Sequence, residues 1–384
     1  MGYPGRIEES EAEMIKLEEV AKVYPDGTEA VKGISFEIQN GEFCVLLGPS
    51  GCGKTTTMKM INRLIPITSG KILVDGTDNT KLDVNDLRRG IGYAIQEIGL
   101  FPHMTVSENI TTVPRLLRWA KGKCRQRAIE LLELVGLTPA DNFLDKYPAE
   151  LSGGQRQRVG VARSLGADPP VLLMDEPFGA IDPITRERLQ DEFLRIQGEI
   201  KKTIAFVTHD INEAIKMGDR IVLIRAGKLV QYDTPAELLS RPKDDFVRDF
   251  VGADRALKSL RLMRVKEVMR ASPPTVSLEE GLSSVRKQME SVGLKWLMAV
   301  DDERFMGWVS WEDLGKGEKV RDIVIPPATT ATPNTPLNQA LSLMLNSAIG
   351  NLGVVDDEER LLGVLTFDCI RNVIVEFQSE GEER

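Results

Sequence analysis

Residues 43–64 read FCVLLGPSGCGKTTTMKMINRL, and the architecture can be built outward from this segment. A strand-like apolar run leads into the pattern G-x-x-x-x-G-K-[ST], which is followed by a helix-like stretch. Glycines let the backbone wrap closely, so that its N–H groups and the N-terminus of the next helix converge on phosphate groups. The sequence therefore predicts a phosphate cradle at Gly48, Pro49, Ser50, Gly51, Cys52, Gly53, Lys54, Thr55 and Thr56.

Two side chains of this loop have separate expected roles. We expect Lys54 to neutralise charge on the β- and γ-phosphates and the Thr55 hydroxyl to bind Mg²⁺. The matching acids lie in VLLMDE at 171–176, where neighbouring side chains of a strand point to opposite faces. Asp175 can then hold Mg²⁺ through water, and Glu176 can accept a proton from the water that attacks the γ-phosphate. A lone Asp-Glu pair more often begins a solvated loop.

The segment LSGGQ at 151–155 leads into a basic helix. Ser152 is first of all a candidate N-cap for that helix. The two glycines beside it leave further N–H donors open, so the same residues could bind a phosphate supplied from outside. The residues concerned are Ser152, Gly153, Gly154 and Gln155.

LSGGQ placed about twenty residues before a strand that ends in Asp-Glu is similar to the signature of ABC-type ATPases, and the resemblance runs from about residue 14 to 240. It implies an α/β fold of the P-loop NTPase type, ATP hydrolysis with Mg²⁺, and a head-to-tail dimer in which the 152–155 segment acts on the partner's nucleotide. Further matches are Gln96 as the Q-loop glutamine that contacts Mg²⁺, water and the membrane partner, His209 as the switch histidine, Asp182 as the D-loop acid, and Tyr24 as the adenine-stacking aromatic.

The chain of 384 residues divides by composition into consecutive segments. We expect a polar arm at 1–13, the nucleotide-binding domain at 14–240, a helical linker at 241–262, two repeats at 263–317 and 318–378, and an acidic tail at 379–384. The repeat is visible as VKEVM at 265 against VRDIV at 320. Two copies are too few for a solenoid, so a pair of small α/β units fits better.

The repeats resemble a tandem CBS module, whose ligand stretch is G-h-x-[ST]-x-x-D. Ser310 and Asp313 fit it in the first copy, whereas the second has Thr366 followed by Cys369 in place of the acid. Three functions remain open: an adenine-nucleotide sensor, for instance for cyclic di-AMP; a salt sensor that docks on anionic lipid; or a dimerisation module. The lipid-docking alternative would use Arg261, Arg264, Lys266 and Arg270.

Residues 96–110 resemble the Q-loop region of importers for quaternary amines such as glycine betaine, carnitine and choline, which also carry CBS modules. The resemblance implies an ATPase subunit at the cytoplasmic face of the membrane, paired with an identical or related subunit, a permease and, through the permease, a substrate-binding protein. An importer for amino acids or another solute is the main alternative. A soluble non-transport ABC ATPase is the less favoured one.

Composition agrees with this interpretation. There are 49 lysines and arginines against 58 aspartates and glutamates, a net charge of −9, which argues against a nucleic-acid partner. No apolar run approaches 18 residues, so we expect no membrane span. Two histidines are too few for a histidine-rich metal site, and the four cysteines are expected to be small buried side chains.

Overall fold

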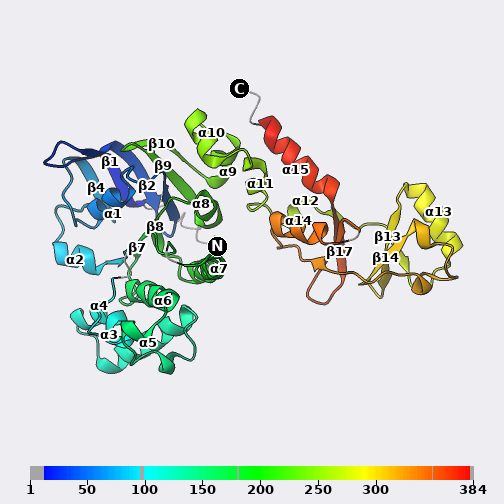
Figure 1. Ribbon diagram of the computed structural model, residues 1–384, viewed down its shortest axis with the longest axis horizontal. Helices are drawn as coiled ribbons and strands as arrows, with labels where there is room; N and C mark the ends of the chain where they lie inside the picture. The colour runs from blue at the N-terminus through cyan, green and yellow to red at the C-terminus, as the bar shows by residue number, and fades with distance from the viewer. Residues whose placement is uncertain (1–12, 96–98, 180, 348, 381–384) are drawn as a thin grey trace, which may run out of the picture. The chain divides into compact units, whose positions relative to one another are not determined.

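The computed structural model describes residues 13–95, 99–179, 181–347 and 349–380. The chain forms two compact units, Met1–Leu238 and Leu239–Arg384, and each is described by itself (Figure 1). No helix within these described ranges is long and apolar enough to cross a membrane. The N-terminal arm predicted at 1–13 and the end of the acidic tail fall almost entirely outside the described residues.

A six-stranded sheet forms the centre of the first unit. All neighbouring strands are parallel except the antiparallel edge pair β10–β9. Short apolar runs at 43–47, 171–174, 203–208 and 220–225 predict buried strands. The structure confirms all four as strands: β3, β7 and β8 are buried at every residue, and β9 is buried except at its two ends. In spatial order the strands are β10 (Lys228–Asp233), β9 (Arg220–Arg225), β3 (Phe43–Leu47), β8 (Thr203–Thr208), β7 (Val171–Asp175) and β6 (Ile91–Ala94).

A second, antiparallel sheet packs on the first. It is not predicted from the sequence, because the alternation of apolar runs with amphipathic segments from about residue 14 to 240 indicates only a largely parallel sheet covered by helices. Its apolar residues alternate with polar ones, as in Ile15 and Leu17, and their side chains share one core with Leu46 and Val207 of the parallel sheet. In spatial order it contains β2 (Glu29–Gln39), β1 (Glu13–Val23), β4 (Ser69–Val74) and β5 (Thr77–Asp78).

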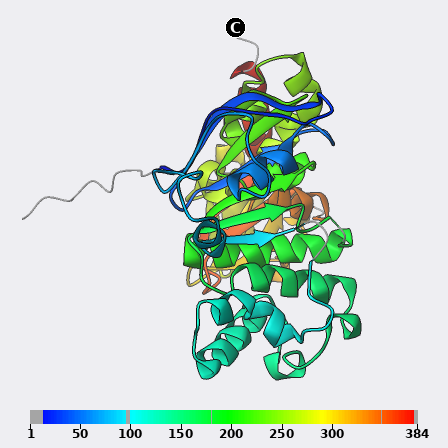
Figure 2. The same ribbon diagram turned by 90° about the vertical axis from the view of Figure 1, so that its left-hand side faces the viewer.

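Helices complete the first unit. Figures 1 and 2 show α3, α5 and α6 on the side of the parallel sheet away from β1 and β2. The sequence over 123–135 places Ala128, Leu131, Leu132 and Val135 on one helical face and so predicts an amphipathic helix. The structure confirms it as α5, with Ala128, Leu131 and Leu132 buried. The helices are α1 (Lys54–Ile61), α2 (Val84–Arg89), α3 (Val106–Ile110), α4 (Thr112–Leu116), α5 (Lys121–Leu134), α6 (Gly153–Ser164), α7 (Pro183–Ile200), α8 (Ile211–Met217) and, across the unit boundary, α9 (Pro235–Ser240).

The second unit opens with α10 (Asp245–Val251), α11 (Arg255–Ser259) and α12 (Val265–Val268) and then contains two similar halves. Each half has a short strand, a helix and a hairpin, as the internal repeat predicts. One half comprises β12 (Thr275–Ser277), α13 (Leu282–Val292), β13 (Trp296–Asp301) and β14 (Arg304–Ser310). The other comprises β15 (Thr330–Ala331), α14 (Leu337–Leu345), β16 (Asn351–Val355), β17 (Leu361–Thr366) and α15 (Phe367–Glu380), with β11 (Arg270–Ala271) added at its edge.

Candidate functional site

The phosphate loop runs from the end of β3 to the start of α1, as the sequence predicted. Two of its glycines are sterically required. A Cβ on Gly48, at φ 148°, would lie 2.1 Å from the carbonyl oxygen of Ile224, and one on Gly53, at φ 110°, would lie 2.5 Å from that of Ala30. Lys54 begins α1 and is buried, with its Nζ donating to the Gly48 carbonyl at 2.6 Å.

A cavity of about 270 Å³ lies over this loop. Ser50, Gly51, Gly53, Lys54, Thr55 and Thr56 line it together with Ala30 and Glu176. The cavity therefore brings the loop and the second carboxylate of VLLMDE to the same space, although more than a hundred residues separate them. Tyr24 follows β1, with Lys22 Nζ lying 5.2 Å from the centre of its ring, and does not belong to the described residues that line the cavity.

Thr55 and Asp175 meet beside this cavity. The Thr55 hydroxyl donates to Asp175 Oδ1 at 3.1 Å, and Asp175 is buried at the end of β7. Burial raises the pKa of the Asp175 carboxyl, and the hydrogen bond from Thr55 partly opposes that rise. A hydroxyl and a carboxylate are hard oxygen donors of the kind that Mg²⁺ prefers, so the pair fits that ion.

Glu176 and His209 form the other half of the site. The Glu176 backbone has a φ of 46°, and its N–H donates to the Val207 carbonyl at 3.0 Å, which fixes it beside β8. Glu176 Oε1 lies 3.1 Å from His209 Nδ1. The glutamate side chain is 20% exposed and the imidazole 59%, so the histidine reaches outward from a glutamate that lines the cavity. Such a carboxylate can accept a proton from water in the cavity.

The segment 151–155 caps a helix within its own chain. Ser152 Oγ accepts from the Gln155 N–H at 3.2 Å, and Gln155 Oε1 accepts from the Ser152 N–H at 3.0 Å. A Cβ on Gly154 would have no neighbour within 4 Å, so the helix N-terminus is open beside the cap. Among the described residues that line the cavity over the phosphate loop, none comes from 151–155.

Asp182 and Gln96, the two remaining predicted residues, are not among the described residues that line the cavity over the phosphate loop. Asp182 is the N-cap of α7, where its Oδ1 accepts from the Thr185 N–H at 3.0 Å, and this bond lowers the pKa of its carboxyl. The neighbouring Ile184 is 78% exposed. Gln96 lies outside the described residues.

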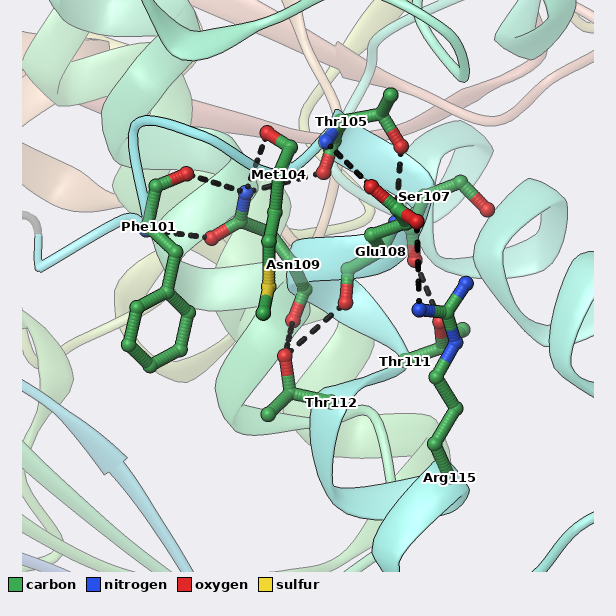
Figure 3. A network of polar contacts seen from close by, with 9 residues as sticks. All are labelled: Phe101, Met104, Thr105, Ser107, Glu108, Asn109, Thr111, Thr112 and Arg115. Atoms are coloured by element: carbon green, nitrogen blue, oxygen red, sulfur yellow. Dashed lines mark hydrogen bonds and ion pairs between the residues drawn. The ribbon is translucent and has the colours of Figure 1, made fainter.

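A polar network just after the Gln96 segment was missed by the sequence reasoning. Asn109 is fully buried and points into the turn that follows Phe101 (Figure 3). Its Oδ1 accepts from the Phe101 N–H at 2.7 Å, while its Nδ2 lies 3.1 Å from the carbonyl oxygens of Phe101 and Met104 and 3.0 Å from that of Thr105. One amide thus fixes the whole turn. The sequence offers little signal for this role, because Asn109 lies between Glu108 and Ile110 in a short segment with no distinguishing pattern.

This turn borders a groove of about 280 Å³. Arg163 Nη1 donates to the Gly99 carbonyl, and its guanidinium carbon lies 5.9 Å from the centre of the Phe101 ring. The groove is both cationic and aromatic, with Arg88, Arg89, Tyr93, Phe101 and Arg163 among its lining residues.

The second unit has a cavity of its own, also about 280 Å³. Arg270, Ser272, Lys295, Trp296, Trp308 and Thr366 are among the residues that line it. Thr366 Oγ1 lies 3.2 Å from the Cys369 Sγ that replaces the expected acid. In the other copy Ser310 Oγ accepts from the Glu312 N–H at 3.2 Å and Asp313 pairs with Lys316 at 2.5 Å. Residues of both repeats line this cavity, because Arg270, Trp296 and Trp308 lie within 263–317 and Thr366 lies within 318–378.

A glycine-rich loop between a buried strand and a helix, facing a second strand that ends in Asp-Glu, defines a P-loop nucleoside triphosphatase. The sequence profile of the family described as ABC transporter matches residues 31–179, and that of the CBS domain matches 265–316 and 320–376. The structure is similar to the "Dimeric Structure of MJ0796, a Bacterial ABC Transporter Cassette", with a TM-score of 0.53 and 36% identity over 58% of this chain and 99% of that one.

Relatives match over nearly the whole chain. The glycine betaine/carnitine/choline transport ATP-binding protein OpuCA of Bacillus subtilis is 46% identical over 94% of this chain and 96% of its own length. The osmoprotectant import ATP-binding protein OsmV of Salmonella typhimurium is 45% identical over 97% of this chain and 98% of its own. The chain belongs to the family of ABC transporter ATP-binding proteins, which hydrolyse ATP, and it carries tandem CBS domains.

Proposed function

We propose that this chain is the ATP-hydrolysing subunit of an importer for osmoprotectant quaternary amines, the class that includes glycine betaine, carnitine and choline. The observation that carries this proposal is the match to OpuCA and OsmV, because it extends through the CBS domains to nearly the full length of both chains. Uptake of labelled glycine betaine, carnitine and choline into cells that lack their own betaine transporters tests it. Accumulation that requires both this subunit and its permease supports the proposal, whereas uptake of an amino acid alone would favour the alternative importer.

The catalytic arrangement follows from the cavity over the phosphate loop. Glu176 accepts the proton of the attacking water, and His209, held 3.1 Å from it, contacts the γ-phosphate. Lys54 neutralises phosphate charge from within the loop. Mg²⁺ held by Thr55, Asp175 and Gln96 would supply further neutralisation of charge on the phosphates. Tyr24 stacks on adenine in this proposal.

The nucleotide is closed in by a second subunit. Ser152, Gly153, Gly154 and Gln155 then act in trans, and Asp182 lies at the same interface. The open helix N-terminus at Gly154 supports this arrangement, since N–H donors there would stabilise phosphate and exclude water. MJ0796, which resembles this chain, is described as a dimer.

Mixed dimers test the trans arrangement. A subunit carrying Lys54→Ala is combined with one carrying Ser152→Ala, so that each mixed dimer keeps one composite site intact. We expect such dimers to recover about half of the wild-type hydrolysis rate, while each parent variant alone stays inactive. Hydrolysis by the mixture that is no faster than by either parent would contradict the arrangement.

We place the permease at the groove bordered by the Phe101 turn, with the subunit held peripherally at the cytoplasmic face of the membrane and the substrate-binding protein acting through the permease. The cationic lining of Arg88, Arg89 and Arg163 supports a partner segment that carries acidic side chains. Replacement of Arg89 by Glu is expected to reduce co-purification of the permease while ATP binding by the isolated chain persists. Unchanged co-purification would move the contact elsewhere.

We further propose that the second unit binds an adenine nucleotide, such as cyclic di-AMP, in the cavity lined by Thr366. Trp296 and Trp308 offer stacking surfaces, and Arg270 and Lys295 offer charge for phosphate. Calorimetry of the full chain carrying Lys54→Ala, with cyclic di-AMP, AMP and ATP, tests this proposal. Heat that disappears with Trp296→Ala supports it. A flat response to all three, with salt-dependent binding to phosphatidylglycerol vesicles, would favour the lipid-docking alternative instead.

A further inference from the structure

A buried glutamate lies behind the switch histidine and has no part in the mechanism above. Glu213 belongs to the first turn of α8 and is only 8% exposed. Burial raises the pKa of its carboxyl, and a hydrogen bond from Thr208 opposes that rise. Burying a carboxylate in this way lowers the stability of the fold unless its oxygens accept hydrogen bonds. The groups that bond to Glu213 therefore indicate its role.

The first partner holds the loop that carries His209. Glu213 Oε2 accepts from the Thr208 hydroxyl at 2.6 Å, and the same hydroxyl oxygen accepts from the Asp210 N–H at 3.0 Å. Thr208 is 1% exposed. The residues on both sides of His209 are thus tied to one buried carboxylate, which restricts the backbone from which the imidazole extends toward Glu176.

The second set of partners comes from α7, whose N-cap is Asp182. Glu213 Oε1 accepts from Gln190 Nε2 at 3.0 Å and lies 4.0 Å from Arg186 Nε. Arg186 Nη2 in turn donates to the carbonyl of Ile181 at 3.0 Å, one residue before the N-cap. A continuous polar path therefore joins the residues beside Asp182 to the loop of His209.

We propose that Glu213 is a positioning residue for ATP hydrolysis: it fixes the loop that aims His209 at Glu176 and links that loop to the α7 terminus. The inference rests on the proposed roles of Glu176 and His209. It assigns no contact between Glu213 and the nucleotide. Loss of the link is therefore expected to slow hydrolysis without weakening nucleotide binding, since a displacement near 1 Å can cost about 100-fold in rate.

The experiment compares Thr208→Val with Thr208→Ser in the full-length protein. Valine keeps the shape and removes the hydroxyl, whereas serine keeps the hydroxyl. We expect kcat to fall by about tenfold to 100-fold with valine and to be largely retained with serine. The Kd for a fluorescent ATP analogue should change by less than about threefold in both. Glu213→Gln, which preserves side-chain size, serves as the second variant and should also lower kcat without raising Kd.

A double mutant separates positioning from a general loss of structure. In a His209→Ala background, Thr208→Val should add little further loss of kcat, because the histidine that it positions is gone. Equal kcat for the valine and serine variants, or a full additional loss in the double mutant, would overturn the inference. If His209→Ala itself hydrolyses ATP at the wild-type rate, the proposed role of His209 fails as well, which is a different result from normal hydrolysis by Thr208→Val alone.

Discussion

Replacement of Glu176 by glutamine changes one atom at the centre of the proposed chemistry. The side chain lines the cavity over the phosphate loop, and its Oε1 lies 3.1 Å from His209 Nδ1. Glutamine has the same size and can still form a hydrogen bond to the imidazole, but it cannot accept a proton. The substitution therefore removes the general base while leaving the walls of the nucleotide site in place.

The expected magnitude follows from that single loss. General-base catalysis contributes about 10²–10⁴-fold, which corresponds to about 2.7–5.4 kcal/mol of transition-state stabilisation. We therefore expect kcat of Glu176→Gln to fall by that factor. ATP affinity should stay within about threefold of wild type, because the residues that hold the phosphates are unchanged. With hydrolysis blocked and binding retained, ATP should also shift the variant toward the dimer.

The assay measures phosphate release by the full-length chain with Mg-ATP, nucleotide binding by fluorescence, and association by size-exclusion chromatography with and without ATP. Glu187→Gln is the matched control. It makes the same replacement of a carboxylate by an amide, but at an exposed position on α7. Phosphate release by Glu176→Gln within about threefold of the Glu187→Gln rate would refute the assignment of Glu176 as base.

Three more predictions concern single contacts. Asp175→Asn should abolish hydrolysis yet raise the unfolding midpoint of the nucleotide-free chain at neutral pH. Burial raises the pKa of Asp175, so its charged form opposes folding and the stability of the wild-type chain increases as pH falls; an unchanged midpoint at neutral pH would contradict this. Gly48→Ala should abolish ATP binding, because the new Cβ would lie 2.1 Å from the Ile224 carbonyl oxygen. The control is Gly122→Ala, whose Cβ would meet no atom within 4 Å: it should leave ATP binding unchanged and leave the melting temperature unchanged or raise it. Asn109→Ala should lower the free energy of unfolding by about 1–3 kcal/mol and expose the Phe101 turn to proteolysis, because it removes a buried amide that bonds the Phe101 N–H and three backbone carbonyls of the turn. Denaturant titration that shows no loss would contradict this.

Local sequence was sufficient wherever one short segment carries both a strand or helix signal and its chemistry. The apolar run before Gly48 became β3, and the helix predicted after the loop begins at Lys54. The acids of VLLMDE fall at the end of β7, beside the loop. These predictions concern only the order of motifs along the chain. Because the carboxyl ends of parallel strands lie at one edge of the sheet, the loop after β3 and the acids after β7 come close together in space.

Sequence was insufficient where packing between distant segments decides the outcome. Ile15 and Leu17 alternate with polar residues, but nothing local says that their strand joins an antiparallel sheet lying on the parallel one. The phosphate-binding role predicted for Ser152 also involves a second chain, whereas within its own chain the residue forms a capping box. A pattern of residues cannot distinguish these two uses, because both need the same hydroxyl at a helix N-terminus.

Buried polar side chains are the hardest class to predict, and they are where the structure adds most. Asn109 and Glu213 each sit in short helices whose sequences look ordinary, and both would be assigned to solvent from composition alone. Each is buried because its partners arrive from elsewhere: a turn several residues upstream for Asn109, and strand β8 together with α7 for Glu213. An unpaired polar group in such a place would cost stability, so these hydrogen bonds fix the conformation of the loops that they join. The Glu213 network holds a loop beside the proposed catalytic surface, and the Asn109 network holds a turn beside the proposed permease-facing surface. The nucleotide contacts are shared by P-loop proteins, so the geometry of these loops is the feature through which this chain would tune hydrolysis.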